Sequence, residues 1–480
     1  MSYFAWQMER FRAGAERPAV IWRDQAYTFG DLATRCERWL DRFAAAGIRR
    51  GSSVAVVGEY SPRSISSLLA LLKLGCVLVP LSWESREPNE ELLAVAGVGH
   101  LLEIDREDGW RLSEWRQNGS RQKMEPGCRQ HPLLERQRVA GEPSLVLFSS
   151  GSTGQPKAIL HGLSRLLNKF RTPRHCYRTL GFLLFDHIGG FNTLFYSLAN
   201  LGCLVVSQDR TVTRVCEAIE RHRVELLPTS PSFLNLMLAS EAHRSFDLSS
   251  LELITYGTEV MSERTLATAN EAFPHARFLQ TYGLSEVGIL RSKSQANGSL
   301  MVKVGGEDFE TKVVDGRLHV RGGSSMLGYL NAPDPFDEEG WLDTGDEVVQ
   351  EGSYYRFLGR QSDIINVGGQ KVYPAAIEEV ISELPEVTDV SVFGEKHPLL
   401  GQTVTAAVQL VDSISALEMK RRITRHCSGR LLPYMIPVKV RIVDDQLFTH
   451  RFKKIRSPRR GANAMSPRKG PHAAQSQSWK

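Results

Sequence analysis

Small hydroxyl side chains and glycines crowd the stretch FSSGSTGQPK, which runs from Phe148 to Lys157. The apolar run SLVLF, which ends at Phe148, predicts a buried strand. A glycine-rich loop can point its backbone N–H groups inward, hydroxyl groups donate hydrogen bonds, and a lysine neutralises charge, so this combination can hold phosphate. We expect the strand, the loop and then a helix over LSRLLNKF, residues 163–170. A flexible linker is the alternative, but linkers do not normally adjoin a buried strand or end on Pro-Lys.

Two other motifs are excluded by their spacing. In the P-loop of NTPases the lysine directly follows the second glycine, whereas Gln155 and Pro156 separate Gly154 from Lys157 here. The stretch QTYGLSEVG, residues 280–288, lacks the last glycine of the GxSxG nucleophile elbow, so a serine hydrolase is disfavoured.

Two further stretches carry polar turns. In GWLDTGDEVV, Asp343 and Asp346 flank a Thr-Gly pair, and a carboxylate in such a turn can accept hydrogen bonds from ribose hydroxyls; an ordinary Asx turn is the alternative. The stretch FLGRQSDIINVGGQKVYPAAIEEVI places Gly-Arg before a strand, a Gly-Gly turn after it and then a helix that starts with proline.

Together, and in this order, these stretches resemble the motifs of the adenylate-forming superfamily, which includes acyl-CoA synthetases, adenylation domains of peptide synthetases and luciferases. The first is similar to the family's [YF]-T-S-G-[ST]-T-G-x-P-K-G loop, with Ser149 for Thr and Ala158 for the final Gly. TYGLSE resembles its Y-G-x-[ST]-E motif, DTGD its T-G-D motif, and GRQSDIINVGGQKVYPAAIE its hinge and following loop. The likeness covers roughly residues 20 to 456, which makes a chance match of motifs improbable.

The resemblance implies a site for ATP and Mg²⁺. Glu286 would bind Mg²⁺, Tyr282 would pack on the adenine, and Asp346 would hold the ribose hydroxyls with help from Arg360. The other ATP-binding positions that it implies are Lys157, Ser149, Ser150, Gly151, Ser152, Thr153 and Gly154 at the β- and γ-phosphates, Ser285 at phosphate, and Gly257, Thr258, Glu259 and Gly283 around the base.

The implied reaction is attack of a carboxylate oxygen on the α-phosphate, with pyrophosphate leaving. Because two anions meet, cations are needed: Mg²⁺, Lys157 and a second lysine. The family's stretch for that lysine is P-x-[ST]-x-[ST]-G-K-[IVL], and DQLFTHRFKKIRS stands in its place. Keeping the isoleucine after the lysine selects Lys454, although Pro, Ser and Gly are replaced by Phe448, Phe452 and Lys453. Lys453 is the competing candidate.

The resemblance also implies a second half-reaction, for which the small C-terminal domain rotates. The hinge residue would be Ser362, in place of the usual Asp or Lys, and Asp363 follows it. Gly368 and Gly369 would let a pantetheine thiol pass to the acyl group.

The acid pocket is implied in and near LLFDHIGGFNT, with Phe185, His187 and Tyr256 as wall residues and Gly283 beside them. HIGG is more similar to acyl-CoA synthetases than to amino-acid-activating domains. A register shifted by two would place Asp186 where those domains bind an α-amine, so amino acids stay open as substrates. Core packing is the alternative role for His187 and Phe185.

The elements that must position these residues alternate between strands and helices. Residues 29–47 predict a helix with Asp31 as its cap and Gly47 at its end, and residues 62–75 predict a helix from Pro62 to Gly75. Short apolar strands such as VAVV and CVLVPL lie between such helices, which predicts an α/β fold with parallel-rich sheets layered with helices. We expect an N-terminal ATP- and acid-binding domain at 1–358, a hinge at 359–362, a small mobile α+β lid domain at 363–457 and a basic disordered tail at 458–480.

Composition fits a soluble enzyme. The chain has 480 residues, too many for one compact core, and it is 42% apolar and 24% charged. The net charge of +5 arises from the last 30 residues, which hold nine of the 59 basic side chains and no acidic one. Seven scattered cysteines form no CxxC pair, and no apolar run is long enough for a membrane span. We therefore expect a cytoplasmic protein with no membrane span and no nucleic-acid partner. The basic tail is expected to be a solvated end, with contact to nucleic acid or anionic lipid as the alternative.

The combined prediction is an AMP-forming acid–thiol ligase. It would use ATP and Mg²⁺ to make an acyl-adenylate from a small carboxylic acid and then a thioester, with CoA as the expected thiol. One alternative enzyme would pass the acyl group to a carrier protein or an amine. The alternative from another class is a binding or regulatory protein with a decayed site, which the altered lysine stretch suggests.

Overall fold

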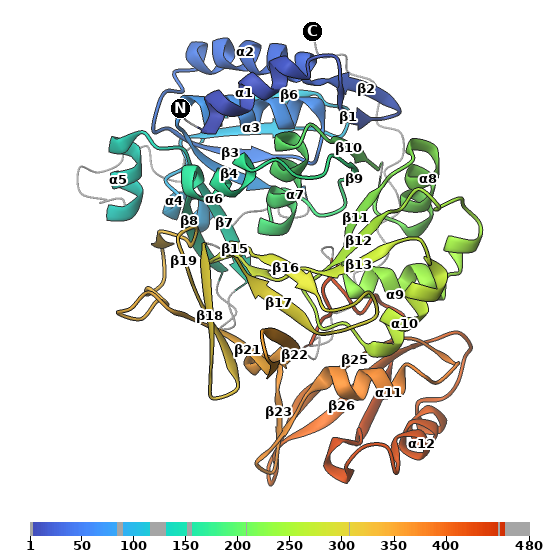
Figure 1. Cartoon of the computed structure of the whole chain (residues 1–480). Coiled ribbons are helices and arrows are strands. Elements are labelled where there is room, and N and C mark those ends of the chain that lie inside the picture. The colour runs from blue at the N-terminus through green and yellow to red at the C-terminus, as the bar shows by residue number, and fades with distance from the viewer. Residues whose placement is uncertain are drawn as a thin grey trace, which may run out of the picture. The chain divides into compact units, whose positions relative to one another are not determined.

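The computed structural model describes residues 3–83, 90–115, 131–150, 156–207, 209–306, 308–449 and 452–456. The chain divides into two compact units (Figure 1). The large unit comprises Met1–Ile364 together with Phe448–Lys454, and the small unit comprises Ile365–Leu447 and continues from Ile455. The expected α/β class with a separate C-terminal domain is confirmed. The predicted tail, 458–480, lies outside the described residues.

Two sheets of the large unit consist mainly of parallel strands. Sheet I contains, in order across it, β20 (Gly328–Tyr329), β8 (Pro156–Gly162), β7 (Ser144–Ser150), β4 (Val77–Leu81), β3 (Ser53–Val57), β5 (His100–Ile104) and β6 (Trp110–Glu114). Sheet II contains β13 (Arg277–Gln280), β12 (Leu253–Tyr256), β11 (Leu226–Thr229), β9 (Arg178–Leu180), β10 (Cys203–Val206), β1 (Pro18–Trp22) and β2 (Gln25–Thr28).

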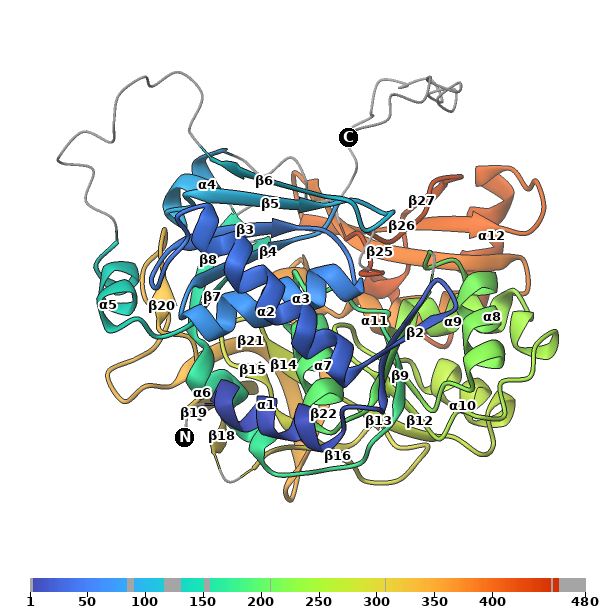
Figure 2. The ribbon, with the colours of Figure 1, turned by 90° about the horizontal axis from the view of Figure 1, so that it is seen from above.

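The hydrophobic core forms on both faces of sheet I because successive side chains of a strand point to opposite faces. In β3, Val54 and Val56 belong to a cluster shared with sheet II and helices α2 (Phe29–Ala45), α3 (Pro62–Leu74) and α7 (Ile188–Ala199). Ala55 and Val57 belong to the cluster on the other face. Figure 2 shows α2 and α3 running side by side along these strands. A strand buried on both faces reads as a continuous apolar run, as VAVV does.

Capping residues fix the ends of the predicted helices. Thr28, and not Asp31, is the N-cap of α2; Asp31 is the third helical residue and its carboxylate bonds back to the Thr28 N–H, which completes a capping box. Helix α3 is capped by Ser61 and ends at Gly75, which has a φ of 72°. A side chain at Gly75 would also come within 2.4 Å of the Gly141 carbonyl, so the position needs glycine twice over.

A third sheet of the large unit, sheet III, is antiparallel and was not predicted. It contains β16 (Arg291–Ser294), β17 (Val302–Gly305), β22 (Tyr354–Arg360), β21 (Leu342–Glu351), β19 (Arg317–Gly322) and β18 (Phe309–Val314). The short hairpin of β14 (Gly283–Leu284) and β15 (Gly288–Ile289) precedes it.

The small unit packs two helices on one five-stranded sheet. Its strands are β23 (Ile365–Val367), β24 (Gln370–Val372), β25 (Val387–His397), β26 (Gly401–Leu410) and β27 (Lys439–Ile442), and its helices are α11 (Pro374–Ile381) and α12 (Ala416–Cys427). Ile377, Ile381, Met419 and Ile423 of the helices pack on Val392 and neighbouring strand residues to form a core of its own.

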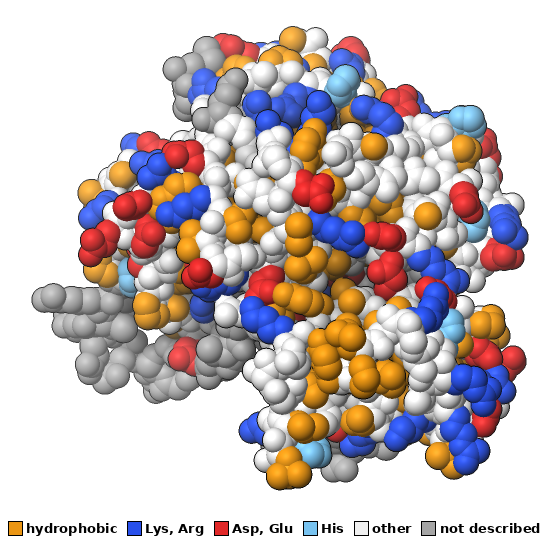
Figure 3. All heavy atoms as spheres, turned by 60° about the horizontal axis from the view of Figure 1, so that its bottom comes forward, with side chains coloured by type: hydrophobic (Ala, Val, Ile, Leu, Met, Phe, Trp, Pro, Cys, Tyr) orange, Lys and Arg blue, Asp and Glu red, His pale blue; other side chains and the backbone are white. Residues whose placement is uncertain are grey.

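The remaining helices and 3-10 turns connect these strands. They are α1 (Tyr3–Ala13), α4 (Glu90–Val95), α5 (Pro132–Ala140), α6 (Leu163–Asn168), α8 (Val212–His222), α9 (Pro231–Ala239), α10 (Glu263–Ala272), η1 (Lys169–Arg171), η2 (Ala242–Arg244), η3 (Gln361–Asp363) and η4 (Pro433–Met435). Within the described ranges, every helix falls short of the length and apolarity that crossing a membrane would require. Basic and acidic side chains are interspersed on the face shown in Figure 3.

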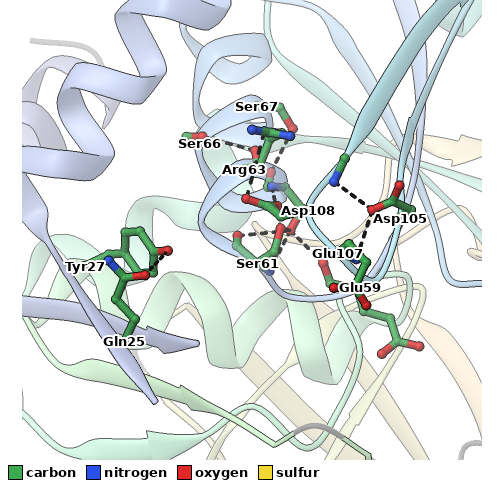
Figure 4. A network of polar contacts seen from close by, with 12 residues as sticks. Gln25, Tyr27, Glu59, Ser61, Arg63, Ser66, Ser67, Asp105, Glu107 and Asp108 are labelled. Atoms are coloured by element: carbon green, nitrogen blue, oxygen red, sulfur yellow. Dashed lines mark hydrogen bonds and ion pairs between the residues drawn. The ribbon is translucent and has the colours of Figure 1, made fainter. Parts of the chain in front are cut away.

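A polar network fastens the edge of sheet I (Figure 4). Oδ1 of Asp105 accepts the backbone N–H groups of Glu107 and Gly109, at 2.9 and 2.7 Å, and so closes the turn between β5 and β6. Asp108 in that turn lies 3.9 Å from the guanidinium of Arg63 in the first turn of α3. The network therefore ties the hairpin to α3 and has a structural role.

Candidate active site

The phosphate loop lies in a β-hairpin. Strands β7 and β8 are antiparallel and pair up to Ser150 and Pro156, so the predicted loop residues Gly151, Ser152, Thr153 and Gly154 fall outside the described residues. The helix predicted over residues 163–170 is present as α6 followed by η1, but the seven residues of β8, which the prediction lacked, lie between it and the loop. Because β8 is buried along most of its length, its sequence lacks the alternation that marks a half-exposed strand. No helix dipole therefore acts at this loop through α6.

Lys157 is held in place on both sides along the chain. The side-chain amide of Asn331 accepts a hydrogen bond from the Ala158 N–H at 2.8 Å and donates one to the Pro156 carbonyl at 3.0 Å. The Lys157 ammonium lies over the ring of Tyr329, with Nζ 4.6 Å from the ring centroid. Lys157 pairs with Ser149 across the hairpin, so both are at the base of the loop.

Glu286 lies beside the same tyrosine. The Tyr329 hydroxyl donates to Oε1 of Glu286 at 2.7 Å, and the Glu286 carbonyl accepts the Met326 N–H at 2.7 Å. Glu286 also acts electrostatically on Arg360, so the two side chains are near each other. The predicted metal carboxylate and the predicted phosphate lysine thus share one aromatic neighbour.

Two basic side chains, those of His161 and Lys169, donate hydrogen bonds to the loop that carries Ser285 and Glu286. Nε2 of His161 donates to the Ser285 carbonyl at 2.6 Å, and the ammonium of Lys169 donates to the Ile289 carbonyl at 2.7 Å. Burial lowers the pKa of His161 to about 4 and that of Lys169 to about 7. At neutral pH His161 is therefore an uncharged donor, and its strand, β8, is tied to the Ser285 loop.

Tyr282, Asp346 and Arg360 form a connected group. The Tyr282 hydroxyl donates to Oδ2 of Asp346 at 2.7 Å, and Nε of Arg360 donates to Oδ1 at 3.1 Å. The Tyr282 ring stacks on Phe357 with 4.5 Å between centroids. Burial raises the pKa of Asp346, while Arg360 and Tyr282 oppose the rise. A carboxylate with two protein donors keeps further lone pairs that can accept hydroxyl groups.

The three residues from Gly257 to Glu259, predicted to lie around the base, have different surroundings in the structure. Thr258 is exposed and has a φ of 71°, a strained conformation for a β-branched residue and typical of functional sites. The Glu259 carboxylate is hydrogen-bonded within the protein. Its Oε2 accepts the Ser232 hydroxyl at 2.6 Å, and its Oε1 accepts the Lys454 N–H. A side chain at Gly257 would meet the Thr281 carbonyl at 2.7 Å, so close packing explains this glycine.

The segment Phe448–Lys454 belongs to the large unit by its contacts. The ring of Phe452 lies 5.1 Å from Phe182 and 5.0 Å from Phe233, centroid to centroid, and its carbonyl accepts the Ser230 hydroxyl at 3.1 Å. With the Lys454 N–H on Glu259, this docking brings both candidate lysines to the site.

The two lysines of that segment differ in their surroundings. Burial lowers the pKa of Lys453, and Arg360 adds to this, whereas Asp363, Glu259 and Asp346 oppose it. Lys453 is accessible to solvent although protein surrounds its ammonium on several sides. Lys454 is half-buried and its charge acts on Glu259. Both therefore stay candidates for the catalytic cation.

Of the three residues predicted to line the acid pocket, Phe185 and Tyr256 are buried and His187 caps a helix. Phe185 and Tyr256 are each 1% exposed, and Phe185 meets the ring of Tyr60 edge-on at 5.4 Å. His187 is the N-cap of α7, where its Nδ1 accepts the Gly189 N–H at 3.2 Å. Asp186, the alternative amine partner, is 3% exposed, and its Oδ2 accepts the Ser82 N–H at 3.3 Å. These contacts give each residue a structural function, and their part in a pocket stays a prediction.

The predicted hinge and thiol path fall on either side of the division between the units. Ser362 lies in η3, two residues before the end of the large unit at Ile364. In the small unit, Gly368 and Gly369 form the turn between β23 and β24 with φ values of 59° and 87°. They line a groove of about 890 Å³ together with Asn366 and the turn around Lys396–Gln402.

The structure thus brings most of the predicted site together in the large unit. Direct contacts or a shared neighbour link the following residues: Lys157, Ser285, Glu286, Tyr282, Asp346, Arg360 and the segment around Lys454. Residues for which the sequence predicts no function are Tyr329, Asn331, His161 and Phe452. The only signal for the first two was their position in a GYLN stretch far from the other motifs.

The oxygen donors fit Mg²⁺ bound together with a nucleotide. Among the described residues, no three or more His, Cys, Asp or Glu side chains are grouped to hold a metal ion by themselves. Glu286 offers a single carboxylate, with one oxygen bonded to Tyr329. Mg²⁺ prefers oxygen ligands and is usually bound through one or two carboxylates plus the phosphates of the substrate. The donor set suits that mode of binding.

Comparison with known proteins gives the same picture. Residues 8–330 match the model of the AMP-binding enzyme family, and residues 376–453 match its C-terminal domain. Indoleacetate–CoA ligase from Aromatoleum aromaticum is 25% identical over 484 residues, covering 90% of this chain and 93% of the relative.

Two solved structures show the same fold. An anthranilate–CoA ligase, AuaEII, in complex with anthranoyl-AMP has a TM-score of 0.78 at 19% identity, with 95% of each chain covered. The amide bond synthetase McbA from Marinactinospora thermotolerans has a TM-score of 0.71 at 22% identity, with 94% of this chain and 97% of that chain covered.

Proposed function

The chain belongs to the AMP-binding enzymes of the adenylate-forming superfamily, and from this premise we propose that it activates a carboxylic acid with ATP and passes the acyl group to a thiol. The predicted class, an AMP-forming acid–thiol ligase, agrees with the family. The observation that supports the proposal is that Lys157, Glu286 and Asp346 lie in one unit and are connected through Tyr329 and Arg360. These are the residues expected to bind phosphate, Mg²⁺ and ribose.

In the first half-reaction, a carboxylate oxygen of the acid attacks the α-phosphorus of ATP. The bond from that phosphorus to the bridging oxygen breaks, and pyrophosphate takes the electron pair. Lys157 would neutralise the leaving phosphates, and Lys454 would stabilise the charge that develops on the attacking carboxylate and the α-phosphate. Preorganised cations of this kind need no rearrangement during the reaction, which is why they lower its barrier.

The other site residues would orient the nucleotide. Tyr282 would lie against the adenine, and Asp346, held by Tyr282 and Arg360, would accept the ribose hydroxyls. Glu286 would hold Mg²⁺, which supplies charge neutralisation at the phosphates. Ser149 and Ser285, and the loop residues between β7 and β8, would donate to phosphate oxygens.

In the second half-reaction, a thiolate attacks the acyl carbon and AMP leaves with the electron pair of the broken carbon–oxygen bond. We propose CoA as the thiol, because indoleacetate–CoA ligase and anthranilate–CoA ligase are similar over nearly the whole chain. Gly368 and Gly369 would admit its pantetheine arm, and Ser362 would be the hinge. An amine is the runner-up acceptor, since an amide bond synthetase has the same fold.

The test crosses acids with acceptors. The full-length protein is given MgATP and a panel of acids that begins with aromatic ones, and pyrophosphate and the acyl products are measured with CoA, a carrier protein or simple amines. We expect acid-dependent pyrophosphate release and a thioester with CoA. An amide as the main product would move the assignment to the runner-up, and absence of pyrophosphate with every acid would favour a decayed, binding homologue.

A further inference from the structure

One short segment, Met326–Asn331, contacts both sides of the phosphate and metal site. Its backbone N–H groups donate to the carbonyls of Glu286 at 2.7 Å, Leu160 at 2.7 Å and Ala158 at 2.8 Å. Part of it is strand β20, which pairs with β8. The segment is therefore fastened to the strand that carries Lys157 and to the loop that carries Glu286.

Tyr329 of this segment touches both functional side chains at once. Its hydroxyl donates to Oε1 of Glu286 at 2.7 Å, and its ring face lies 4.6 Å from the Lys157 ammonium. The ring is 5% exposed and packs with Ile159 and Met326, so it has little freedom to move. An aromatic face attracts a cation, and a neutral phenol bonds strongly to a carboxylate. One rigid side chain thus sets the positions of a cation and an anion.

Asn331 fixes the backbone on each side of Lys157. Its Oδ1 accepts from the Ala158 N–H and its Nδ2 donates to the Pro156 carbonyl. These two bonds hold the peptide groups that flank the lysine, and they do so directly after the phosphate loop. An aspartate of the same size could keep only the first bond.

We propose that Tyr329 and Asn331 are positioning residues that fix the Lys157 ammonium and the Glu286 carboxylate relative to each other. In this assignment Tyr329 holds one oxygen of Glu286, so that the other would bind Mg²⁺, and Asn331 would orient Lys157 toward the phosphates. This assignment rests on the proposed function, which gives Lys157 and Glu286 their ligands. A purely structural function for the two residues is the competing explanation.

The experiment measures ATP binding and not turnover. ATP is titrated into the full-length protein in a calorimeter without any acid, over a range of Mg²⁺ concentrations and without Mg²⁺. Tyr329→Phe removes only the hydroxyl and keeps the ring beside Lys157. Its control is Tyr355→Phe, because Tyr355 is similarly buried, at 4% exposed, and its hydroxyl bonds to Thr311 at 3.0 Å in sheet III.

The second variant is Asn331→Asp, and the chain offers a matched control for it. Asn297 makes the same pair of bonds around Arg277: Oδ1 accepts the Phe278 N–H at 2.6 Å and Nδ2 donates to the Ala276 carbonyl at 3.2 Å. Asn297→Asp therefore removes the equivalent side-chain donor, the one that bonds to the Ala276 carbonyl beside strand β13 of sheet II. Thermal unfolding of all four variants reports the purely structural cost.

We expect Tyr329→Phe to raise the Mg²⁺ concentration for half-maximal ATP binding on the order of tenfold, the usual effect of losing a hydrogen bond to a charged group. Its affinity for ATP without Mg²⁺ should match the parent. Asn331→Asp should weaken ATP binding with and without Mg²⁺, whereas both controls should bind as the parent does.

Two results would overturn the assignment. If the parent binds MgATP and Tyr329→Phe has an unchanged Mg²⁺ titration, Tyr329 does not position Glu286, and the proposed function is unaffected. If Asn331→Asp loses no more affinity for ATP than Asn297→Asp does, the bonds of Asn331 around Lys157 have a structural role only. A parent that bound no ATP at any Mg²⁺ concentration would instead contradict the proposed function, and this assignment with it.

Discussion

Tyr282 donates its phenol hydrogen to Oδ2 of Asp346 across 2.7 Å, in a place where Tyr282 is 8% and Asp346 9% exposed. Arg360 satisfies the other oxygen of the carboxylate. The pair links the wall proposed for adenine to the carboxylate proposed for ribose. A nucleotide would therefore meet two groups whose positions are already fixed by each other.

Tyr282→Phe should lower the free energy of unfolding by about 1–3 kcal/mol, because a buried carboxylate loses one of its two donors while the ring stack on Phe357 remains. Urea unfolding measures the change. Tyr27→Phe is the control: its hydroxyl bonds to Gln25 near the surface, and its loss should change stability by less than about 0.5 kcal/mol. Equal effects of the two changes would contradict the proposed link to Asp346.

Lys454→Ala should slow adenylate formation on the order of 10²–10³-fold, the usual cost of removing a preorganised charge at the transition state. The variant keeps the backbone N–H that bonds to Glu259, so the segment should stay docked. Given preformed acyl-adenylate and a thiol, it should still make thioester, because Lys454 would then be outside the site. Normal adenylation in this variant and slow adenylation in Lys453→Ala would transfer the function to Lys453.

Phe452→Ala should also impair adenylation, by undocking the segment that carries both lysines. The ring lies among Phe182, Phe233 and Phe448, and removing it leaves a void between them. We expect a rate lower on the order of tenfold, with partial recovery in Phe452→Leu. Single-turnover measurements on both variants check this, and a parent-like rate in Phe452→Ala would show that the aromatic contacts do not hold the lysines in place.

His161 should make stability depend on pH. Burial lowers its pKa from an ordinary value near 6.5 to about 4, so the unfolded chain binds more protons than the folded protein between those pH values. The stabilising contribution is complete above pH 6.5 and is lost as the pH falls toward 4. The loss should be on the order of 3 kcal/mol. The difference in unfolding free energy between the parent and His161→Gln, measured at pH 5 and pH 7.5, should shrink at the lower pH; a constant difference would mean that His161 titrates normally.

Helices and strands are predicted well where the spacing of apolar residues and the residues typical of helix ends indicate the same bounds. Strand β3 and helices α2 and α3 lie where VAVV and the two amphipathic stretches placed them. The sequence predicts Asp31 as the cap of α2, whereas Thr28 has that position in the structure. Both residue types cap helices, and only the geometry shows which one precedes the first turn. The strand after the phosphate loop was missed because a strand buried on both faces does not alternate.

The sequence predicts only those site residues that lie within recognisable motifs. Tyr282, Asp346 and Glu286 carry recognisable local patterns. The orientation of Glu259 toward Ser232 and Lys454 depends on the docking of a segment about 195 residues away in the chain, and no local pattern contains it. Tyr329 and Asn331 likewise act across more than 40 and 170 residues, respectively. Such pairings are set by the sheet topology, which sequence periodicity does not specify.

Acid-dependent exchange of labelled pyrophosphate into ATP tests the central claim most directly, because it requires acyl-adenylate formation and no acceptor. With at least one acid of the panel, the parent protein should catalyse exchange, and Glu286→Gln should need more Mg²⁺ and exchange more slowly while remaining folded. Exchange without any acid, or equal exchange by parent and Glu286→Gln at limiting Mg²⁺, would contradict the account.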